Sequence, residues 1–226
     1  PKLQGHHSER LQGGEDFFPR LRAESAAAQH YVFLETYIIA SDETGWRIAR
    51  LLAERAEAGV FVALMFDGCG SDELDPDFIN LLESAGVKLH AFRPVSFWRR
   101  SWPWTRRNHR KLAVIDGRVG LVGGMNISND YASWTEGGSN WRDTSVAVEG
   151  PAGRQLENLF RRLWEKETKS KLTVRPGPTV MYPGGVAARF LANFARADRG
   201  FVRQAYLTAL RSARERVRIT NAYFFP

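Results

Sequence analysis

The residues best suited to chemistry lie in one short stretch of the chain, Asn108 to Asp116. A strand is expected there, and strand side chains alternate between two faces, so His109 and Lys111 point to one side and Arg110 to the other. An imidazole beside an ammonium group suits a phosphate ester, because lysine neutralises non-bridging oxygens while histidine attacks phosphorus or moves a proton. An exposed strand edge would also carry such a pair, so the assignment depends on the surrounding residues.

Support for a phosphate site comes from the residues that follow this stretch. Gly123 and Gly124 let the backbone approach a ligand closely, and the Asn126 amide can donate to a phosphate oxygen. Asp116 has two open interpretations, a supporting role in the site or a plain turn aspartate in a hairpin. The full combination predicts a phosphate-binding site.

Alternating strands and helices are expected to position these residues. Apolar runs rich in β-branched and aromatic residues predict strands, and capped amphipathic stretches predict helices. Two short strands around Asp116-Gly117 predict a tight hairpin. The alternation indicates an α/β fold, a mixed β-sheet flanked by helices. Strands are expected at 31–39, 60–66, 87–92, 111–115, 118–122 and 144–148, and helices at about 46–58, 76–85 and 150–165.

The C-terminal part of the chain has a different character. From Lys169 to Gly185 it is rich in proline and glycine, which predicts a connector or an ordered surface loop. A helix is then expected at about 201–214 and a strand at 217–225. The segments 27–39 and 213–225 align without gaps at an offset of 186 residues, which is either accidental or the start of a second repeat.

The amino-acid composition narrows the range of possible binding partners and sites. The chain has 226 residues, with 32 Lys and Arg against 25 Asp and Glu, and this net charge of +7 favours nucleic acid or an anionic membrane surface. The single cysteine, Cys69, excludes an internal disulfide framework and a Cys-rich zinc site. No run of about 18 apolar residues occurs, so no segment is predicted to span a membrane. Residues 1–10 are polar and lack an apolar signal core.

The pattern His109-x-Lys111-x4-Asp116, followed by Gly123-Gly124-x-Asn126, resembles the HKD motif of the phospholipase D superfamily. The resemblance implies a phospholipase D-like α/β fold, with one full repeat and the start of a second. The implied domains are a first phospholipase D-like domain at 1–168, a connector at 169–197 and a truncated second repeat at 198–226. Further marks resemble the bacterial cardiolipin synthase branch of this superfamily: Leu34–Tyr37, Asp67-Gly68, Gly70-Ser71, Trp141–Asp143, Gly150-Pro151 and Asn221–Pro226.

The resemblance implies a mechanism without metal or cofactor. Two HKD motifs face one pocket; one histidine attacks the phosphodiester and becomes a phosphohistidine, while the other protonates the leaving alcohol. In this sequence it implies His109 as nucleophile or acid, Lys111 and Asn126 as the phosphate clamp, and a supporting role for Asp116. Gly123 and Gly124 would line the phosphate site.

Two further acids could serve the site. A reacting histidine needs its other ring nitrogen held by an acceptor, usually a carboxylate. Asp143 lies where family members carry such an acid, although an ion pair between Arg142 and its surroundings is the alternative explanation of this segment. Glu35, at the end of the first expected strand, either lines the pocket or forms structural hydrogen bonds.

Only one HKD motif is present in the sequence. The remaining histidines, His6, His7, His30 and His90, do not lie in a matching pattern. Either a longer parent chain carries a second motif, near position 295 by the same offset, or two copies of this chain complete one site.

The stretch from Arg93 to Lys111 is basic and aromatic. It holds seven Lys and Arg residues and no acid. Tryptophan favours the membrane–water interface and arginine favours anionic head groups, whereas stacking on single-stranded nucleic acid and a plain surface loop are the alternatives. The candidate membrane contacts are Trp98, Arg99, Arg100, Trp102, Trp104, Arg106 and Arg107.

The resemblance and the basic stretch together favour a phosphatidyl transferase that joins two phosphatidylglycerol molecules and releases glycerol. Its expected place is the cytoplasmic face of a bacterial membrane, bound peripherally to anionic phospholipid. One alternative is a phosphodiesterase or nuclease of the same superfamily that dimerisation completes. Another is a non-catalytic half-site that binds lipid or nucleic acid, with nucleic acid the less favoured partner.

Overall fold

The computed structural model describes residues 3–94, 107–177, 179–192 and 200–219. The candidate membrane contacts other than Arg107 therefore lie outside the described residues. The chain forms two compact units, Pro1–Arg189 and Phe190–Pro226. The HKD residues all belong to the first unit.

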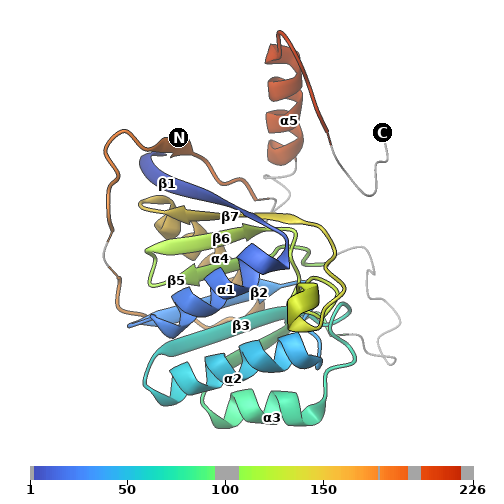
Figure 1. Ribbon diagram of the computed structural model, residues 1–226. Helices are drawn as coiled ribbons and strands as arrows, with labels where there is room; N and C mark the ends of the chain where they lie inside the picture. Colours follow the sequence, from blue (N-terminus) through green and yellow to red (C-terminus); the bar gives the residue numbers. More distant parts are fainter. Residues whose placement is uncertain (1–2, 95–106, 178, 193–199, 220–226) are drawn as a thin grey trace. The chain divides into compact units, whose positions relative to one another are not determined.

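The first unit is built on one mixed sheet of eight strands in the order β4-β3-β2-β5-β6-β7-β1-β8 (Figure 1). Strands β2, β3 and β4 are parallel to one another, and the other neighbours pair antiparallel. The predicted mixed α/β architecture is confirmed. The strands are β1 (Leu3–Gln12), β2 (Tyr31–Thr36), β3 (Phe61–Asp67), β4 (Lys88–Phe92), β5 (Leu112–Ile115), β6 (Val119–Gly123), β7 (Thr144–Glu149) and β8 (Val186–Ala188).

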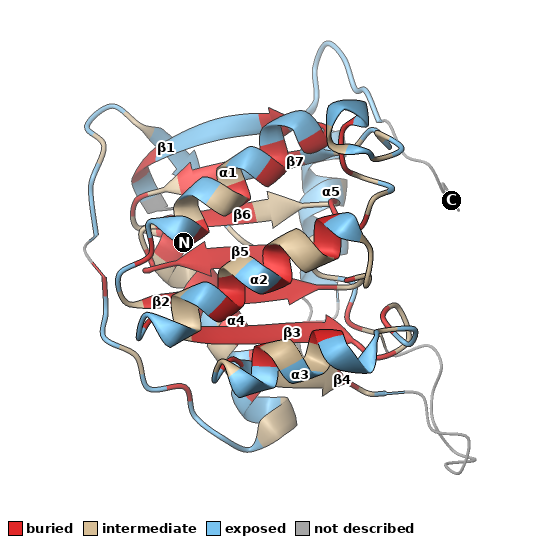
Figure 2. Ribbon diagram, turned by 60° about the horizontal axis from the view of Figure 1, so that its bottom comes forward, coloured by how far each residue is buried: buried red, intermediate tan, exposed pale blue. Residues whose placement is uncertain are grey.

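Helices cover both faces of this sheet. Figure 2 shows α1 (Gly14–Ala26), α2 (Glu43–Glu57) and α3 (Pro76–Ser84) on one face, with α4 (Ala152–Thr168) behind the sheet. Alternate strand residues serve the two layers: Leu34 packs in the core under the first three helices, and Phe33 stacks on Phe160 of α4 with ring centroids 4.8 Å apart. Asp42 caps α2 by accepting from the Gly45 N–H at 2.9 Å, so the helix begins three residues before the expected start at about 46.

Strand β1 and the end of β2 differ from the sequence expectation. No strand was predicted before residue 31, yet β1 pairs with β7 through six residues. Most of its side chains are exposed and polar, so main-chain pairing rather than apolar burial places it. The strand predicted at 31–39 leaves the ladder after Thr36, and Ile39 forms an isolated bridge with Ile127.

The segment after α4 belongs to the first unit as far as Arg189. Leu172 is buried, β8 pairs with β1, and the Tyr182 hydroxyl donates to Glu149 at 2.5 Å. The first compact unit accordingly runs to Arg189, beyond the expected boundary at 168.

The second unit contains α5 (Phe201–Ser212), close to the expected helix at 201–214, and none of the side chains of this helix is buried within the described residues. Most of the strand predicted at 217–225 lies outside the described residues.

Candidate functional site

Five chain segments meet at one edge of the sheet because of how its strands run. Parallel strands β2 and β3 both end at this edge, and β5, antiparallel to β2, begins there. Strand β6 ends there and β7 begins there, since each runs antiparallel to the strand before it. The last residue of β3, Asp67, lies at this edge, and the adjoining loops carry the HKD residues His109 and Lys111 together with Tyr37 and Asp143. Ligands of open sheets bind outside the carboxyl ends of parallel strands, which is the place these side chains occupy.

His109 and Lys111 lie side by side, as their alternation predicted. The Lys111 Nζ lies 3.2 Å from His109 Nδ1 and 3.2 Å from the His109 carbonyl oxygen. His109 is exposed, whereas Lys111 is only 8% exposed. Arg110 points the opposite way, toward Glu35. An exposed imidazole therefore stands beside a nearly buried ammonium group.

The contact between these two side chains determines which ring nitrogen of His109 carries a proton. A protonated lysine only donates hydrogen bonds, so Nδ1 accepts from Lys111 and Nε2 carries the proton of a neutral imidazole. That tautomer suits proton donation from Nε2. Attack on phosphorus by the same nitrogen requires the proton on Nδ1 and an acceptor facing it.

Burial and charge tune both groups. Burial lowers the pKa of Lys111 to about 8, while Asp143 and Asp67 oppose this shift. Burial and the neighbouring Lys111 lower the pKa of His109, and Asp67 opposes this shift. At neutral pH the pair therefore combines a charged lysine with a neutral histidine.

The ring of Tyr37 lies against both groups. Its centroid is 4.6 Å from that of the His109 ring, with the ring planes at 45°, and 5.1 Å from the Lys111 Nζ. Tyr37 directly follows β2, where the chain leaves the sheet. The three side chains thus form one cluster.

A buried acid network fixes the segment that carries the pair. Glu35, fully buried, accepts from Arg110 Nε at 2.7 Å, from Arg110 Nη2 at 2.9 Å and from Asn108 Nδ2 at 2.7 Å. Burial raises the pKa of Glu35, opposed by Arg110 and Asn108. Asp67 accepts from the Asn108 backbone N–H at 2.8 Å, and Arg107 lies 3.5 Å from the Asp67 carboxylate. The structure shows both expected features of Glu35, because it forms these structural hydrogen bonds and also lines the small cavity beneath the site.

The two glycines bring strand β7 and its preceding acid close to the site. A side chain at Gly123 would overlap Ser145 of β7, and one at Gly124 would overlap the Asp143 carboxylate. Asp143 accepts from the Thr144 backbone N–H at 2.6 Å. Because neither position has a β-carbon, Asp143 can lie close to Lys111. The same lack of side chains would let a ligand approach the backbone closely.

Asn126 is engaged within the protein. Its Oδ1 accepts from the Ile38 N–H at 3.1 Å, its Nδ2 donates to the Tyr131 hydroxyl at 2.9 Å, and the residue is 3% exposed. It ties the β6–β7 loop to the segment after β2. A phosphate contact by Asn126 would therefore require its second amide proton.

Asp116 lies at the other end of β5, away from the pair. Its carboxylate accepts from three consecutive backbone N–H groups, those of Gln29 and His30 at 2.9 Å and that of Tyr31 at 2.8 Å. It has a φ of 53° in the hairpin turn before Gly117. The geometry therefore supports the turn interpretation of Asp116 and separates it from the residues gathered around Lys111.

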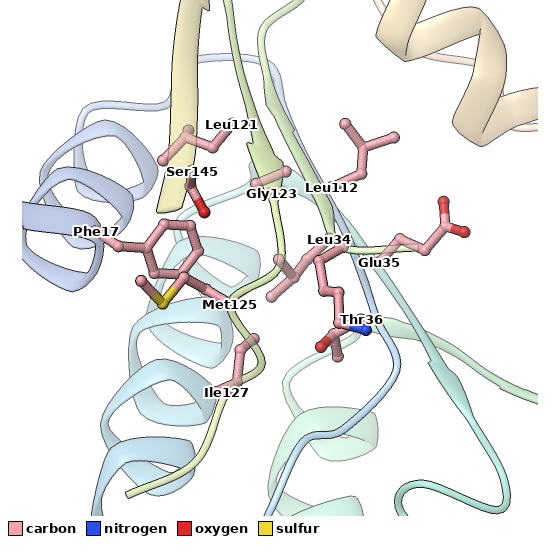
Figure 3. Close-up of a pocket in the computed structure, with 12 residues that line it drawn as sticks. Phe17, Leu34, Glu35, Thr36, Leu112, Leu121, Gly123, Met125, Ile127 and Ser145 are labelled. Atoms are coloured by element: carbon pink, nitrogen blue, oxygen red, sulfur yellow. The ribbon is translucent and has the colours of Figure 1, made fainter. Parts of the chain in front are cut away.

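The cavity beneath the site is small. It measures about 10 Å³, room for one water molecule at most. Lys111 contributes to its lining. Figure 3 shows Gly123 at this cavity together with apolar side chains such as Phe17, Leu34 and Met125. Within the described residues, no cluster of His, Cys, Asp or Glu could hold a metal ion. A search of the same residues for a helix able to cross a membrane finds none.

Sequence reasoning gave no role to Tyr37 or Asp67, although both lie in segments that resemble the family. The available signal was their position at the ends of two buried apolar runs, because parallel strands deliver such residues to one edge.

The chain is similar to known proteins over most of its length. The family model described as "Cardiolipin synthase, PLD-like domain" matches residues 21–164. A cardiolipin synthase of Geobacillus kaustophilus is 34% identical over 96% of this chain and 44% of its own length. A cardiolipin synthase A of Pseudomonas fluorescens is 32% identical over 100% of this chain and 47% of its own length. The chain thus spans less than half the length of these curated relatives.

Solved structures share the fold. NucT from Helicobacter pylori superposes with a TM-score of 0.56 at 16% identity, covering 74% of this chain and 98% of NucT. Nuc from Salmonella typhimurium, a phospholipase D family member, superposes with a TM-score of 0.52 at 14% identity, covering 76% of this chain and 99% of Nuc.

Proposed function

Since the chain belongs to the family of phospholipase D-like domains of cardiolipin synthases, we propose that it is the catalytic half of a phosphatidyl transferase. The reaction joins two phosphatidylglycerol molecules and releases glycerol. The observation that carries this proposal is the contact of His109 with the nearly buried Lys111 at the carboxyl edge of β2 and β3.

The proposed reaction has two balanced steps. In the first, a histidine nitrogen forms a bond to phosphorus while the bond from phosphorus to the glycerol oxygen breaks, and a second histidine gives that oxygen its proton. In the second step, the hydroxyl of another phosphatidylglycerol loses its proton to that second histidine and attacks phosphorus. The bond between phosphorus and the first histidine then breaks, which frees that histidine. Lys111 neutralises the phosphate oxygens throughout, and His109 is one of the two histidines. Asp143 is the proposed acceptor for Nδ1 of His109 when that histidine attacks.

The proposal requires a second histidine from outside the first unit. The internal similarity at an offset of 186 residues and the length of the relatives support a second HKD motif in a longer parent chain. A second copy of this chain is the other source. Anionic phospholipid and a membrane surface are the proposed partners, and the cytoplasmic face of a bacterial membrane is the proposed location.

A second candidate function is a phosphodiesterase or nuclease whose site two copies complete. The observation that favours it is the coverage of NucT and Nuc, since the superposition accounts for 98% and 99% of those chains. A non-catalytic half-site that binds lipid or nucleic acid is the remaining alternative.

One assay separates these functions. The full-length protein is incubated with phosphatidylglycerol vesicles or single-stranded oligonucleotide, and cardiolipin, glycerol and cleaved oligonucleotide are quantified by mass spectrometry. Equal amounts of cardiolipin and glycerol are expected, with both lost in His109→Asn and retained in the control variant His90→Asn. Cleaved oligonucleotide without cardiolipin would establish the phosphodiesterase or nuclease function. The absence of product from both substrates would favour the non-catalytic half-site.

A further inference from the structure

We propose that Tyr37 is a positioning residue that holds His109 and Lys111 in one orientation; this inference rests on the proposed function. The side chains form a closed triangle, in which the tyrosine ring contacts the imidazole, its face lies 5.1 Å from the ammonium, and the ammonium contacts Nδ1. A rotation of any member about its side-chain bonds breaks two of these contacts.

Tyr37 can serve as a platform because its own position is fixed from two loops. The Ser71 hydroxyl donates to the Tyr37 carbonyl at 3.3 Å and accepts from the Ile39 N–H at 2.9 Å. From the other side, Asn126 accepts from the Ile38 N–H. Gly70 approaches so closely that a side chain there would overlap the Tyr37 carbonyl oxygen. The loops after β3 and β6 therefore hold the segment in place.

Among the described residues, Asp143, the carboxylate expected to orient His109, forms no hydrogen bond or ion pair with it. Asp143 accepts from the Thr144 backbone, packs against Gly124 and acts on Lys111 through its charge. Within the described residues, the contacts that orient the imidazole come from Lys111 and Tyr37. Because His109 is exposed, its ring would otherwise sample several rotamers.

The ring also favours the charged form of its neighbour. The negative face of an aromatic ring attracts an ammonium group, most strongly where water is excluded. Lys111 is nearly buried, and the charged or titratable groups that face it are Asp67 at the end of β3, Asp143 before β7, His109 beside it and Tyr37 after β2. Tyr37 thus works with the two acids to keep Lys111 protonated at neutral pH, against its burial.

The test compares Tyr37→Phe, which keeps the ring, with Tyr37→Leu and Tyr37→Met, which keep apolar bulk without it. The pKa of Lys111 is measured in the 226-residue chain by NMR of its ε-carbon, assigned with Lys111→Gln. Tyr37→Phe should match the wild type, whereas the pKa in the other two variants should fall by roughly half to one unit.

Kinetics of the full-length protein supply the second readout. The alkaline limb of kcat/KM should move to lower pH with the Lys111 pKa, and kcat should fall roughly 10- to 100-fold with KM changed less than about threefold. Tyr37→Phe should keep the wild-type pH profile and the wild-type kcat. A wild-type Lys111 pKa and pH profile in a folded Tyr37→Leu or Tyr37→Met would overturn the inference. An inactive wild type would instead refute the proposed function, and the NMR result would still decide the role of Tyr37.

Discussion

The two ends of strand β5 carry the two halves of the HKD motif, and they have opposite environments. At the start of the strand, Lys111 lies against His109 and Tyr37, and burial depresses its pKa. At the other end, Asp116 is 5% exposed and accepts three backbone hydrogen bonds. The first end holds a cation whose charged form is disfavoured by burial, and the second end holds an anion that three backbone N–H groups stabilise.

The difference explains why one short motif spans the strand. Asp116 joins the hairpin turn to the entry of β2, so it fixes β2 against β5. Strand β2 then leads to Tyr37 at the opposite edge, and β5 begins beside it with Lys111. The acid therefore helps to fix the register that places His109 and Lys111 beside Tyr37, from about 17 Å away at roughly 3.3 Å per residue.

Loss of the cation at the reactive end gives the largest expected effect. In the full-length protein, Lys111→Ala should lower kcat/KM for the proposed cardiolipin formation by about 10³-fold, because the phosphate loses its charge-assisted donor. Thermal unfolding should not move to lower temperature. Lys88→Ala, an exposed lysine of β4, is the matched control and should retain full activity. Activity within tenfold of wild type in Lys111→Ala would remove Lys111 from the mechanism.

Removal of the acid at the other end should act on stability instead. Asp116→Ala leaves three backbone N–H groups without their acceptor, which should cost roughly 3 kcal/mol in the free energy of unfolding. Denaturant unfolding measures this loss. The molecules that stay folded should keep kcat within about threefold. A large loss of kcat without destabilisation would place Asp116 in the chemistry and erase the contrast between the two ends.

A smaller effect is expected from the network behind the reactive end. Glu35→Gln keeps the size of the side chain but removes the charge that faces Arg110, which should cost about 1–2 kcal/mol in unfolding free energy because Arg110 is partly exposed. The activity should fall less than in Lys111→Ala, since the pair itself remains. Chemical denaturation and turnover of the same preparation give both numbers. An unchanged unfolding free energy would show that Asn108 and Asp67 suffice to hold the segment.

The sequence predicted those parts of the molecule that apolar burial determines. Strands β2 and β3 are buried on both faces, so their apolar runs were visible, and the alternation of His109, Arg110 and Lys111 followed from strand geometry. Strand β1 escaped prediction because its polar side chains face solvent.

The full set of residues that form the site was harder to predict from the sequence than the HKD motif itself. Tyr37 and Asp67 join it only because two parallel strands end at the same edge, which requires the strand order. The expected contact between Asp143 and His109 depended on side-chain packing around Gly124, which spacing along the chain does not encode.

The smallest expected effect is a gain in the free energy of unfolding when Lys111 is replaced. It distinguishes the two ends of β5 directly, because replacement of Asp116 should lower the same quantity. Burial lowers the pKa of Lys111 from 10.5 to about 8, so the unfolded chain binds its proton more tightly than the folded chain does. The destabilisation is then fully present below pH 8 and is relieved as the pH rises from 8 to 10.5. Lys111→Met removes the buried charge but also the contacts with Tyr37 and His109, so a net gain of about 1 kcal/mol is expected at pH 7. Denaturant unfolding at pH 7 and pH 10.5 should show this gain shrinking at the higher pH. An Asp116→Asn variant measured alongside should be destabilised at both pH values, and a Lys111→Met that is also destabilised at both would mean that the two ends of β5 stabilise the fold alike.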